Sequence, residues 1–264
     1  MKVAITAGGT GGHIFPALAI INKIKTHDKN SEFLYFGTTD RMEKDIIPER
    51  GIPYIAIPMK GLDRKNILNN ISVFKIYLNA IKKAEIELKK FKPDIVIGVG
   101  GYITAPVLVA ANRLGIKTLI HEQNSIPGVS NKLLSRFVNK ICISFKESEK
   151  YFPKKKTIYT GNPRSEEILL MEKGKREDFG FNYKSNFIIL VMGSLGSLTM
   201  TKKMKELIPA FKDKNYQVLV VTGKNYYDDY KEVKTPVNVK IVPFYDAKYM
   251  KDANLLITRS GAST

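Results

Sequence analysis

The sequence predicts an α/β protein built from two doubly wound, Rossmann-like domains, the second of them incomplete. Short apolar runs rich in β-branched residues alternate with amphipathic stretches of helical periodicity, and this alternation occurs in two separate series. Glycine-rich loops directly follow three of the apolar runs. Such alternation is typical of parallel sheets covered by helices, which bind ligands at the carboxyl ends of their strands.

The first series predicts an N-terminal domain over residues 1–160. Its buried parallel strands are expected at residues 3–6, 33–36, 54–57, 95–97 and 118–120. Helices are expected over 16–27 and 104–114. A further helix is expected to begin at Asp40, because an N-cap residue is followed three positions later by Glu43. The apolar run 140–144 contains Cys142, the single cysteine, which indicates a buried thiol in a reducing compartment.

The second series predicts a C-terminal domain over residues 161–264, with strands at 187–191, 218–221, 239–242 and 255–258. The stretch 151–164 contains Pro153 and the turn Gly161-Asn-Pro163, so we expect it to connect the two domains. A parallel strand normally leads into a crossover helix, and none follows the last predicted strand. We therefore expect the second domain, and the chain, to be truncated at the C-terminal end.

The chain carries a formal net charge of +18, from 43 basic and 25 acidic residues. This excess favours polyanions such as nucleic acid, anionic lipid or a phosphorylated substrate. Alternatively the charge only keeps the protein soluble, since many lysines are scattered. No nucleic acid partner is expected, because no known binding motif is present. Neither an export signal nor an apolar run of about 20 residues occurs, so a cytoplasmic location is expected.

Three glycine-rich loops are the strongest local signals. Gly8-Gly-Thr-Gly-Gly-His13 lies between the first strand and the first helix, where glycine permits positive φ and the helix N-terminus attracts anions. It matches neither a Walker A loop nor a dinucleotide fingerprint. A tight strand-to-helix connection is the alternative. The loops 98–102 and 193–197 also follow strands, so all three are expected to face a cleft between the domains.

Two polar motifs are further candidates for the site. His121-Glu-Gln-Asn124 follows a predicted strand, and four consecutive polar residues there are expected to line the cleft. The alternative is a hydrogen-bonded loop that only shapes the cleft. Arg164 lies after the turn at Gly161 and could bind phosphate or a nucleotide base, although a surface ion pair is the commoner fate of a lone arginine.

Taken together and in order, these motifs resemble those of the MurG family of bacterial N-acetylglucosaminyltransferases. The resemblance rests on the segments 8–13, 98–102, 121–124, 161–164 and 259–262, with further similarity at 37–43 and 93–94, and it covers essentially the whole chain. It implies the GT-B architecture, in which two Rossmann-like domains face a cleft. It also implies that the N-terminal domain takes the acceptor and the C-terminal domain takes the UDP-sugar.

The resemblance implies an inverting transfer of N-acetylglucosamine from UDP-GlcNAc to the 4-hydroxyl of the N-acetylmuramyl group of lipid I, which forms lipid II for peptidoglycan. The matching donor-site positions are Thr10, Gly11, Gly12, Asn124, Arg164, Ser194, Tyr245, Ala262, Ser263 and Thr264. Of these, Tyr245 corresponds to a backbone contact to uracil. Gly100, Gly101 and Tyr102 correspond to an acceptor or phosphate loop. Leu195 departs from the family, which usually has glutamine there.

Catalysis is expected to need no metal and no cofactor. The sequence has no Asp-X-Asp motif and no ligand cluster of metal-binding spacing. Helix N-termini and Arg164 are expected to balance the charge of the leaving diphosphate. His13 is the first candidate for the general base, since histidine titrates near neutrality. His121 and Glu122 are alternatives, and each could instead orient the acceptor.

The lipid-linked acceptor implies a peripheral location on the cytoplasmic side of the cell membrane. A helical pattern supports this, with an expected core stripe of Ile67, Ile71, Phe74, Leu78, Ile81 and Leu88, widened by Val73, Ile76 and Tyr77. Basic residues surround it at positions 60, 64, 65, 75, 82, 83, 89, 90 and 92, against acidic residues only at 63, 85 and 87. This pattern favours a shallow anchor on anionic lipid. An ordinary amphipathic helix is the alternative.

Two other functions stay open at this point. The chain could be a GT-B transferase of different donor or acceptor specificity. It could also be a catalytically inactive fragment that retains only membrane or acceptor binding. The expected partners under the main hypothesis are UDP-GlcNAc, lipid I and the anionic membrane surface, and other proteins of cell-wall synthesis are further candidates.

Overall fold

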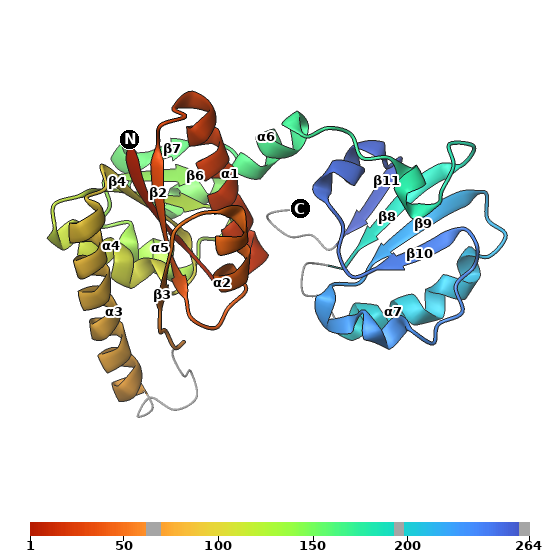
Figure 1. The fold of residues 1–264 in the computed structure, drawn as a ribbon, viewed down its shortest axis with the longest axis horizontal. Coiled ribbons are helices and arrows are strands. Elements are labelled where there is room, and N and C mark those ends of the chain that lie inside the picture. Colours follow the sequence, from red (N-terminus) through yellow and green to blue (C-terminus); the bar gives the residue numbers. More distant parts are fainter. Residues whose placement is uncertain (62–69, 193–197, 259–264) are drawn as a thin grey trace. The chain divides into compact units, whose positions relative to one another are not determined.

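The computed structural model describes residues 1–61, 70–192 and 198–258, and it divides into two compact units (Figure 1). The first unit runs from Met1 to Glu166 and the second begins at Glu167, within helix α6. The division predicted from the sequence lies slightly before this point. Across the described ranges, no helix has both the length and the apolar character needed to cross a bilayer.

The first unit contains a seven-stranded parallel sheet in the order β3-β2-β1-β4-β5-β6-β7. The strands are β1 (Lys2–Ala7), β2 (Glu32–Thr38), β3 (Tyr54–Ile57), β4 (Ile95–Gly100), β5 (Lys117–Glu122), β6 (Lys140–Ile143) and β7 (Thr157–Tyr159). The strand order reverses between β1 and β4, so the sheet has a topological switch point there. Ligands of doubly wound sheets bind outside the carboxyl ends of the strands at such a point.

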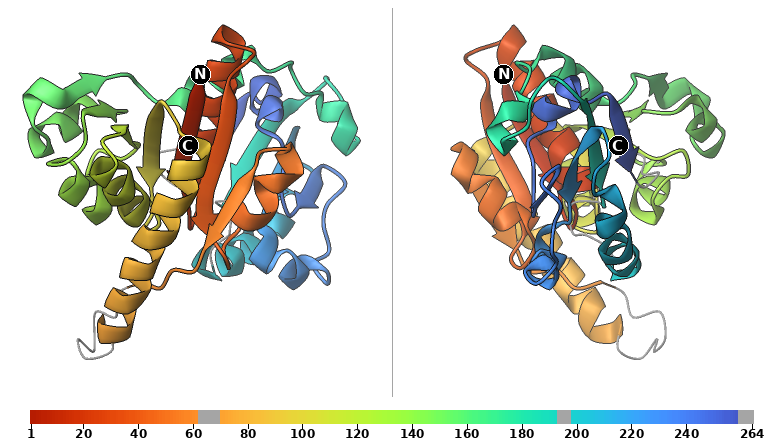
Figure 2. Two further views of the ribbon diagram at one scale, coloured as in Figure 1. Left: turned by 60° about the vertical axis from the view of Figure 1, so that its left-hand side comes forward. Right: turned by 90° about the vertical axis from the view of Figure 1, so that its right-hand side faces the viewer.

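Helices cover both faces of this sheet. They are α1 (Gly11–His27), α2 (Glu43–Ile46), α3 (Asn70–Phe91), α4 (Thr104–Arg113) and α5 (Val129–Leu134), with short 3-10 turns η1 (Pro48–Arg50), η3 (Lys146–Tyr151) and η4 (Lys154–Lys156). Alternate residues of β1 point to opposite faces: Val3 and Ile5 pack with α1, whereas Ala4 packs with α3, α4 and α5. Figure 2 shows this sheet and its helices from two further directions. Burial on both faces explains why the strands are continuously apolar.

Three features of the first unit differ from the predictions. Strand β6 lies in the apolar run around Cys142, and β7 lies inside the stretch predicted to connect the domains. Strand β7 is a short edge strand whose Ile158 and Tyr159 are exposed, so no buried apolar pattern marks it. The helix predicted to begin at Asp40 is α2, which begins at Glu43 with Met42 as its N-cap residue.

Helix α3 buries a different stripe from the predicted one. Its buried residues are Val73, Ala80, Ile81, Ala84 and Leu88, so the prediction is confirmed for Ile81 and Leu88 only. Phe74 and Leu78 are exposed, and the side chains of Ile67 and Ile71 lie outside the described residues. The two alanines contribute small side chains to the packed face, next to the partly buried Tyr77. The bulky Phe74 and Leu78, which mark a core in sequence, instead point outward here.

The second unit contains a four-stranded parallel sheet in the order β10-β9-β8-β11. The strands are β8 (Asn186–Val191), β9 (Tyr216–Val221), β10 (Val239–Val242) and β11 (Leu255–Thr258), which confirms all four predicted strands. The helices are α6 (Pro163–Leu170) and α7 (Leu198–Leu207), with the 3-10 turns η5 (Arg176–Phe179), η6 (Ile208–Phe211), η7 (Lys224–Tyr226), η8 (Asp228–Tyr230) and η9 (Ala247–Asp252). Two separate apolar clusters cover the two faces of this sheet.

Candidate active site

The first two glycine loops meet at the switch point of the first sheet. The Gly8 amide donates to the Gly100 carbonyl at 3.2 Å. At Gly101, a Cβ atom would lie 2.4 Å from the Gly8 carbonyl oxygen, which is far too close for any side chain. Gly9, Gly100 and Gly101 all have positive φ, at 92°, 118° and 87°. Both the close approach and the backbone conformation therefore require glycine here.

His13 lies in the first turn of α1, at the junction of the two loops. Its Nδ1 is 3.0 Å from the Gly8 carbonyl oxygen. A carbonyl can only accept, so Nδ1 carries the hydrogen and the neutral ring keeps its lone pair on Nε2. The ring lies against Gly100, where a Cβ atom would be 2.9 Å from Nε2. The hydrogen bond thus favours the tautomer of the half-buried His13 in which Nε2 can accept a proton.

Glu43 is the residue of this site that the sequence reasoning missed. It is fully buried at the start of α2. Its Oε2 accepts from the Gly9 amide at 3.1 Å, and its Oε1 accepts from the Thr38 amide and hydroxyl at 3.1 and 2.7 Å. The carboxylate therefore ties the first glycine loop to the end of β2. The sequence placed Glu43 in the motif 37–43, but as part of a helix cap rather than as a support for the loop.

A tyrosine completes the support around Glu43. The Tyr54 hydroxyl donates to the Thr38 carbonyl at 2.6 Å. Burial first, and the neighbouring Glu43 carboxylate second, raise the pKa of Tyr54 far above its ordinary value. The phenol consequently stays protonated and remains a donor at the end of β2.

The polar motif at the end of β5 is packed inside the unit rather than spread along its surface. His121, Glu122 and Gln123 are buried, and of the four residues only Asn124 is partly exposed. The expectation that all four line a cleft is therefore wrong for the first three. Glu122 accepts from the amides of Asn124 and Gly128, at 3.0 Å each, and from the side-chain amides of Asn124 and Asn131, at 2.8 and 2.9 Å. The alternative interpretation, a hydrogen-bonded loop, describes this geometry.

His121 has both ring nitrogens engaged. Its Nε2 donates to the Gly161 carbonyl at 3.3 Å, and its Nδ1 accepts from the Gln123 side-chain amide at 3.1 Å. Burial lowers the pKa of His121, against the opposing effects of the Gly161 hydrogen bond and the Glu122 charge. A neutral, fully engaged imidazole holds the segment at Gly161 in place. Of the three candidate bases, His13 alone keeps a ring nitrogen or oxygen with no partner among the described residues.

The remaining candidates in the first unit surround the start of α1. Thr10 is exposed, Gly11 is buried and Gly12 is half-buried. The Arg164 guanidinium stacks on the Phe15 ring of α1, 4.9 Å from its centroid, and the Arg164 amide donates to the Asn162 side chain at 3.0 Å. The Tyr102 hydroxyl accepts from Arg41 Nε at 3.3 Å.

In the second unit, Tyr245 follows β10 and packs partly buried against one face of the sheet. The other candidates there lie outside the described residues: Ser194, Ala262, Ser263 and Thr264. The cleft predicted between the two domains stays a prediction.

Comparison with known proteins extends over both units. The model of the glycosyltransferase family 28 N-terminal domain matches residues 3–143, and that of the glycosyltransferase family 28 C-terminal domain matches residues 187–264. A transferase of Bacillus pumilus (strain SAFR-032) is 40% identical over all of this chain and 74% of its own length. The chain belongs to the MurG group of glycosyltransferase family 28. A relative from Bacillus subtilis (strain 168) is 38% identical, over 100% of this chain and 75% of its own length.

Both Bacillus relatives are named UDP-N-acetylglucosamine--N-acetylmuramyl-(pentapeptide) pyrophosphoryl-undecaprenol N-acetylglucosamine transferase. Among solved structures, MurG of Acinetobacter baumannii is 28% identical with a TM-score of 0.68, over 99% of this chain and 74% of that one. The calicheamicin glycosyltransferase CalG4 is 11% identical with a TM-score of 0.65, over 99% of this chain and 75% of that one, which is a likeness of fold alone. These neighbours identify the GT-B fold of glycosyltransferase family 28.

Two further features of this chain concern metal binding and the reactivity of its cysteine. Within the parts of the chain that the structure describes, no three or more His, Cys, Asp or Glu side chains are grouped so that they could hold a metal ion. Cys142 is a free, half-buried thiol in β6, and burial raises its pKa, so the unreactive thiol form predominates. Independence from metals and cofactors stays a prediction.

Proposed function

We propose that this protein transfers N-acetylglucosamine from UDP-GlcNAc to the N-acetylmuramyl group of lipid I and so forms lipid II for peptidoglycan. The names of relatives at about 40% identity support the donor and the acceptor. The observation that carries the chemistry is the meeting of two glycine loops around His13 at the switch point of the first sheet. Such an edge is where a doubly wound domain binds its ligand.

In the proposed step, Nε2 of His13 takes the proton of the muramyl 4-hydroxyl as that oxygen forms a bond to the anomeric carbon. The bond between the anomeric carbon and the diphosphate breaks, and UDP leaves with that electron pair. The hydrogen bond from Nδ1 to the Gly8 carbonyl fixes the tautomer that makes Nε2 basic. It also stabilises the imidazolium that forms. A single displacement of this kind inverts the anomeric configuration.

Backbone groups and a few side chains would hold the substrates. The first-turn N–H groups of α1, at Gly11 and Gly12, have no acceptor within the helix and suit a phosphate oxygen. Arg164, at the start of α6, and Asn124, just after β5, belong to the same unit and would contact the donor. Glu43 and Glu122 would act by positioning loops, because their carboxylate oxygens already accept hydrogen bonds from those loops. No metal or cofactor has a role in this proposal.

We also propose that the protein works at the cytoplasmic surface of the membrane. Phe74 and Leu78 of α3 lie one helical turn apart and are 64% and 39% exposed. Lys75 and Lys82 flank them on the same helix and are exposed as well. Exposed apolar side chains among lysines suit a shallow contact with anionic lipid. A peripheral contact of this kind would bring the active site to its lipid-linked acceptor.

The test is transfer of radiolabelled N-acetylglucosamine from UDP to a lipid I analogue. This chain is compared with a version extended to the full length of the Bacillus relatives, of which it covers about three quarters. UDP-glucose and UDP-galactose serve as control donors, so that a different sugar specificity would be seen.

Transfer of N-acetylglucosamine by the extended protein supports the proposal, and its absence in the short chain would show that transfer needs the added C-terminal part. If the protein transfers glucose or galactose in preference, the proposal is wrong about the sugar, and the protein is a transferase of different specificity. If both proteins fold but neither transfers sugar, the proposed function is refuted.

A further inference from the structure

One segment of the second unit makes hydrogen bonds and ring contacts along η9. We call residues 169–179 the strap; it begins at the end of α6 and ends with η5. Along η9 it makes one backbone bond, from the Gly174 amide to the Lys248 carbonyl at 3.1 Å. From η9 to the strap, the ammonium group of Lys251 donates hydrogen bonds to the carbonyl oxygens of Leu169 and Met171. The strap therefore follows η9 for its whole length.

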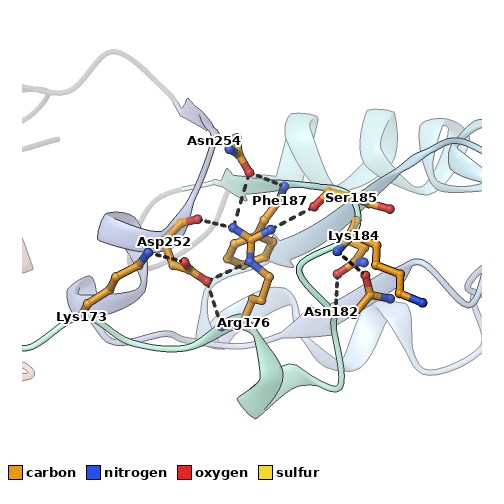
Figure 3. Close-up of polar contacts among 9 residues, drawn as sticks. Lys173, Arg176, Asn182, Lys184, Ser185, Phe187, Asp252 and Asn254 are labelled. Atoms are coloured by element: carbon orange, nitrogen blue, oxygen red, sulfur yellow. Dashed lines mark hydrogen bonds and ion pairs between the residues drawn. The ribbon is translucent and has the colours of Figure 1, made fainter.

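Arg176 is the residue of the strap with the most contacts drawn in Figure 3, and it is buried. Its amide and its Nε both donate to Asp252 Oδ2, at 3.0 and 2.9 Å, and one Nη donates to the Asp252 carbonyl at 2.8 Å. The other Nη donates to the Ser185 carbonyl at 2.9 Å. The guanidinium also stacks on the rings of Tyr183 and Phe187, 4.7 and 5.3 Å from their centroids. One side chain thus joins the strap, the end of η9 and the start of β8.

Asp252 is the matching anchor on η9. Its side chain is 0% exposed and also pairs with Lys173 at 2.8 Å through Oδ1. Burial alone would raise the pKa of Asp252, but the hydrogen bonds from Arg176 and Lys173 outweigh it and lower the pKa. Removing one member of a buried ion pair leaves the other charge uncompensated, so the pair holds the strap and the end of η9 together in one arrangement.

Aromatic packing holds the middle of η9 in the same way. The rings of Phe179 and Tyr249 are 4.7 Å apart, and the Tyr249 hydroxyl donates to Asp178 Oδ2 at 2.9 Å. At Gly174, a Cβ atom would lie 2.5 Å from Tyr249 Cδ1, so the strap approaches the ring as closely as glycine allows. Each end of η9 and its centre are consequently fixed by the strap.

Turn η9 directly continues the loop after β10. Asp246 is its N-cap residue and accepts from the Lys248 amide at 3.0 Å, so the loop 244–246 and η9 form one continuous backbone path. This loop lies at the carboxyl end of β10, the edge at which a parallel sheet binds its ligand. The resemblance to the MurG family implies that the backbone of Tyr245 in this loop contacts the uracil of the donor.

We propose that the Arg176–Asp252 pair positions the loop 244–246 for the nucleotide of the sugar donor. This inference rests on the proposed function, and it makes Asp252 and Arg176 positioning residues rather than catalytic ones. Neither side chain touches the donor. The strap fixes η9, η9 fixes the loop, and the loop presents its backbone to the base.

The test uses Asp252→Asn and the milder Arg176→Lys in the extended protein. Asp228→Asn is the matched control, because Asp228 forms an exposed ion pair with Lys231 in the same unit. We expect faster amide hydrogen exchange over residues 244–252 and a KM for UDP-GlcNAc raised about tenfold with kcat changed less than about twofold, since uniform donor binding is lost. UDP affinity, measured by calorimetry, is expected to fall by the same factor.

Faster exchange without any change in KM or UDP affinity would make the pair purely structural and overturn the proposal. Equal effects from Asp228→Asn would overturn it too. Should Asp252→Asn fail to fold, Arg176→Lys decides, because it keeps the charge but removes the forked hydrogen bonds. If the unsubstituted protein binds UDP but transfers no sugar, the transferase proposal fails, while the UDP affinities still decide the role of the pair.

Discussion

His13 can be tested by removing its ring while the fold is kept. We expect His13→Ala to lower kcat for N-acetylglucosamine transfer by about 10²- to 10⁴-fold, the usual contribution of a general base. KM for UDP-GlcNAc should change little, because Nε2 acts on the acceptor hydroxyl. The control is His27→Ala, at the exposed end of the same helix. An unchanged kcat in His13→Ala would assign the proton transfer to another group.

His121 predicts a pH dependence of stability. The pKa of His121 is lowered from 6.5 in the folded protein. As the pH falls, the unfolded chain therefore binds a proton at this histidine more readily than the folded protein does. The stabilisation is therefore complete above pH 6.5 and is lost progressively below it. We expect the protection factors of the β5 amides, which compare observed with intrinsic exchange rates, to fall below this pH, and His121→Gln to flatten that dependence, with His27→Gln as the control. A histidine NMR titration that placed His121 above 6.5 would contradict this.

At the scale of residues, the sequence showed which groups are unusual but not what they contact. Glycines and His13 could be predicted as a site because their chemistry is local to one loop. Glu43 and Arg176 could not, since their partners lie 34 and 76 residues away. A charged residue in an amphipathic stretch is usually solvated, and only the fold shows that these two are buried.

At the scale of elements, Glu43 links the loop after β1 to the end of β2. We expect Glu43→Gln to loosen that link, because an amide group can offer only one oxygen where the carboxylate offers two to the amides of Gly9 and Thr38. Local stability should fall by about 1–3 kcal/mol, the cost of a buried donor left without an acceptor. Amide exchange in β1 and β2 measures it.

The control for this prediction is Glu49→Gln, which changes an exposed residue just beyond α2. We also expect the glycine loop to bind the donor less tightly in Glu43→Gln, with a raised KM for UDP-GlcNAc. Equal exchange rates in Glu43→Gln and the unsubstituted protein would show that Glu43 does not hold the loop.

Among the elements, nine of the strands were predicted because each is a short apolar run, and burial on both faces keeps such runs continuous. Strand β6 was not predicted as a strand although its run is apolar, and β7 was missed because an edge strand needs only one neighbour and Ile158 and Tyr159 stay exposed. The stripe of α3 was misjudged for a related reason. Periodicity gives several apolar stripes on this helix, and only the packing against α4 selects the one with Ala80 and Ala84.

At the scale of the whole molecule, the net charge of +18 can be separated from the apolar contact of α3. If the charge attracts anionic lipid, binding to vesicles of phosphatidylglycerol and phosphatidylcholine should weaken strongly as salt rises. The screening length falls from about 10 Å at 0.1 M to about 3 Å at 1 M. Vesicles of phosphatidylcholine alone are the control. Equal binding at both salt concentrations would mean that the charge serves only solubility.

The same vesicles test the apolar part of the contact. Phe74→Ser with Leu78→Ser removes two exposed apolar side chains of α3, and we expect weaker sedimentation with anionic vesicles at low salt, since each buried large apolar side chain contributes about 1.5–3 kcal/mol. The control is Leu170→Ser on α6, because Leu170 is 74% exposed and lies in the second unit. If the control weakens binding as much as the α3 variant, the contact is not specific to α3. If neither change matters while salt does, the membrane contact is purely electrostatic, and α3 is an ordinary amphipathic helix.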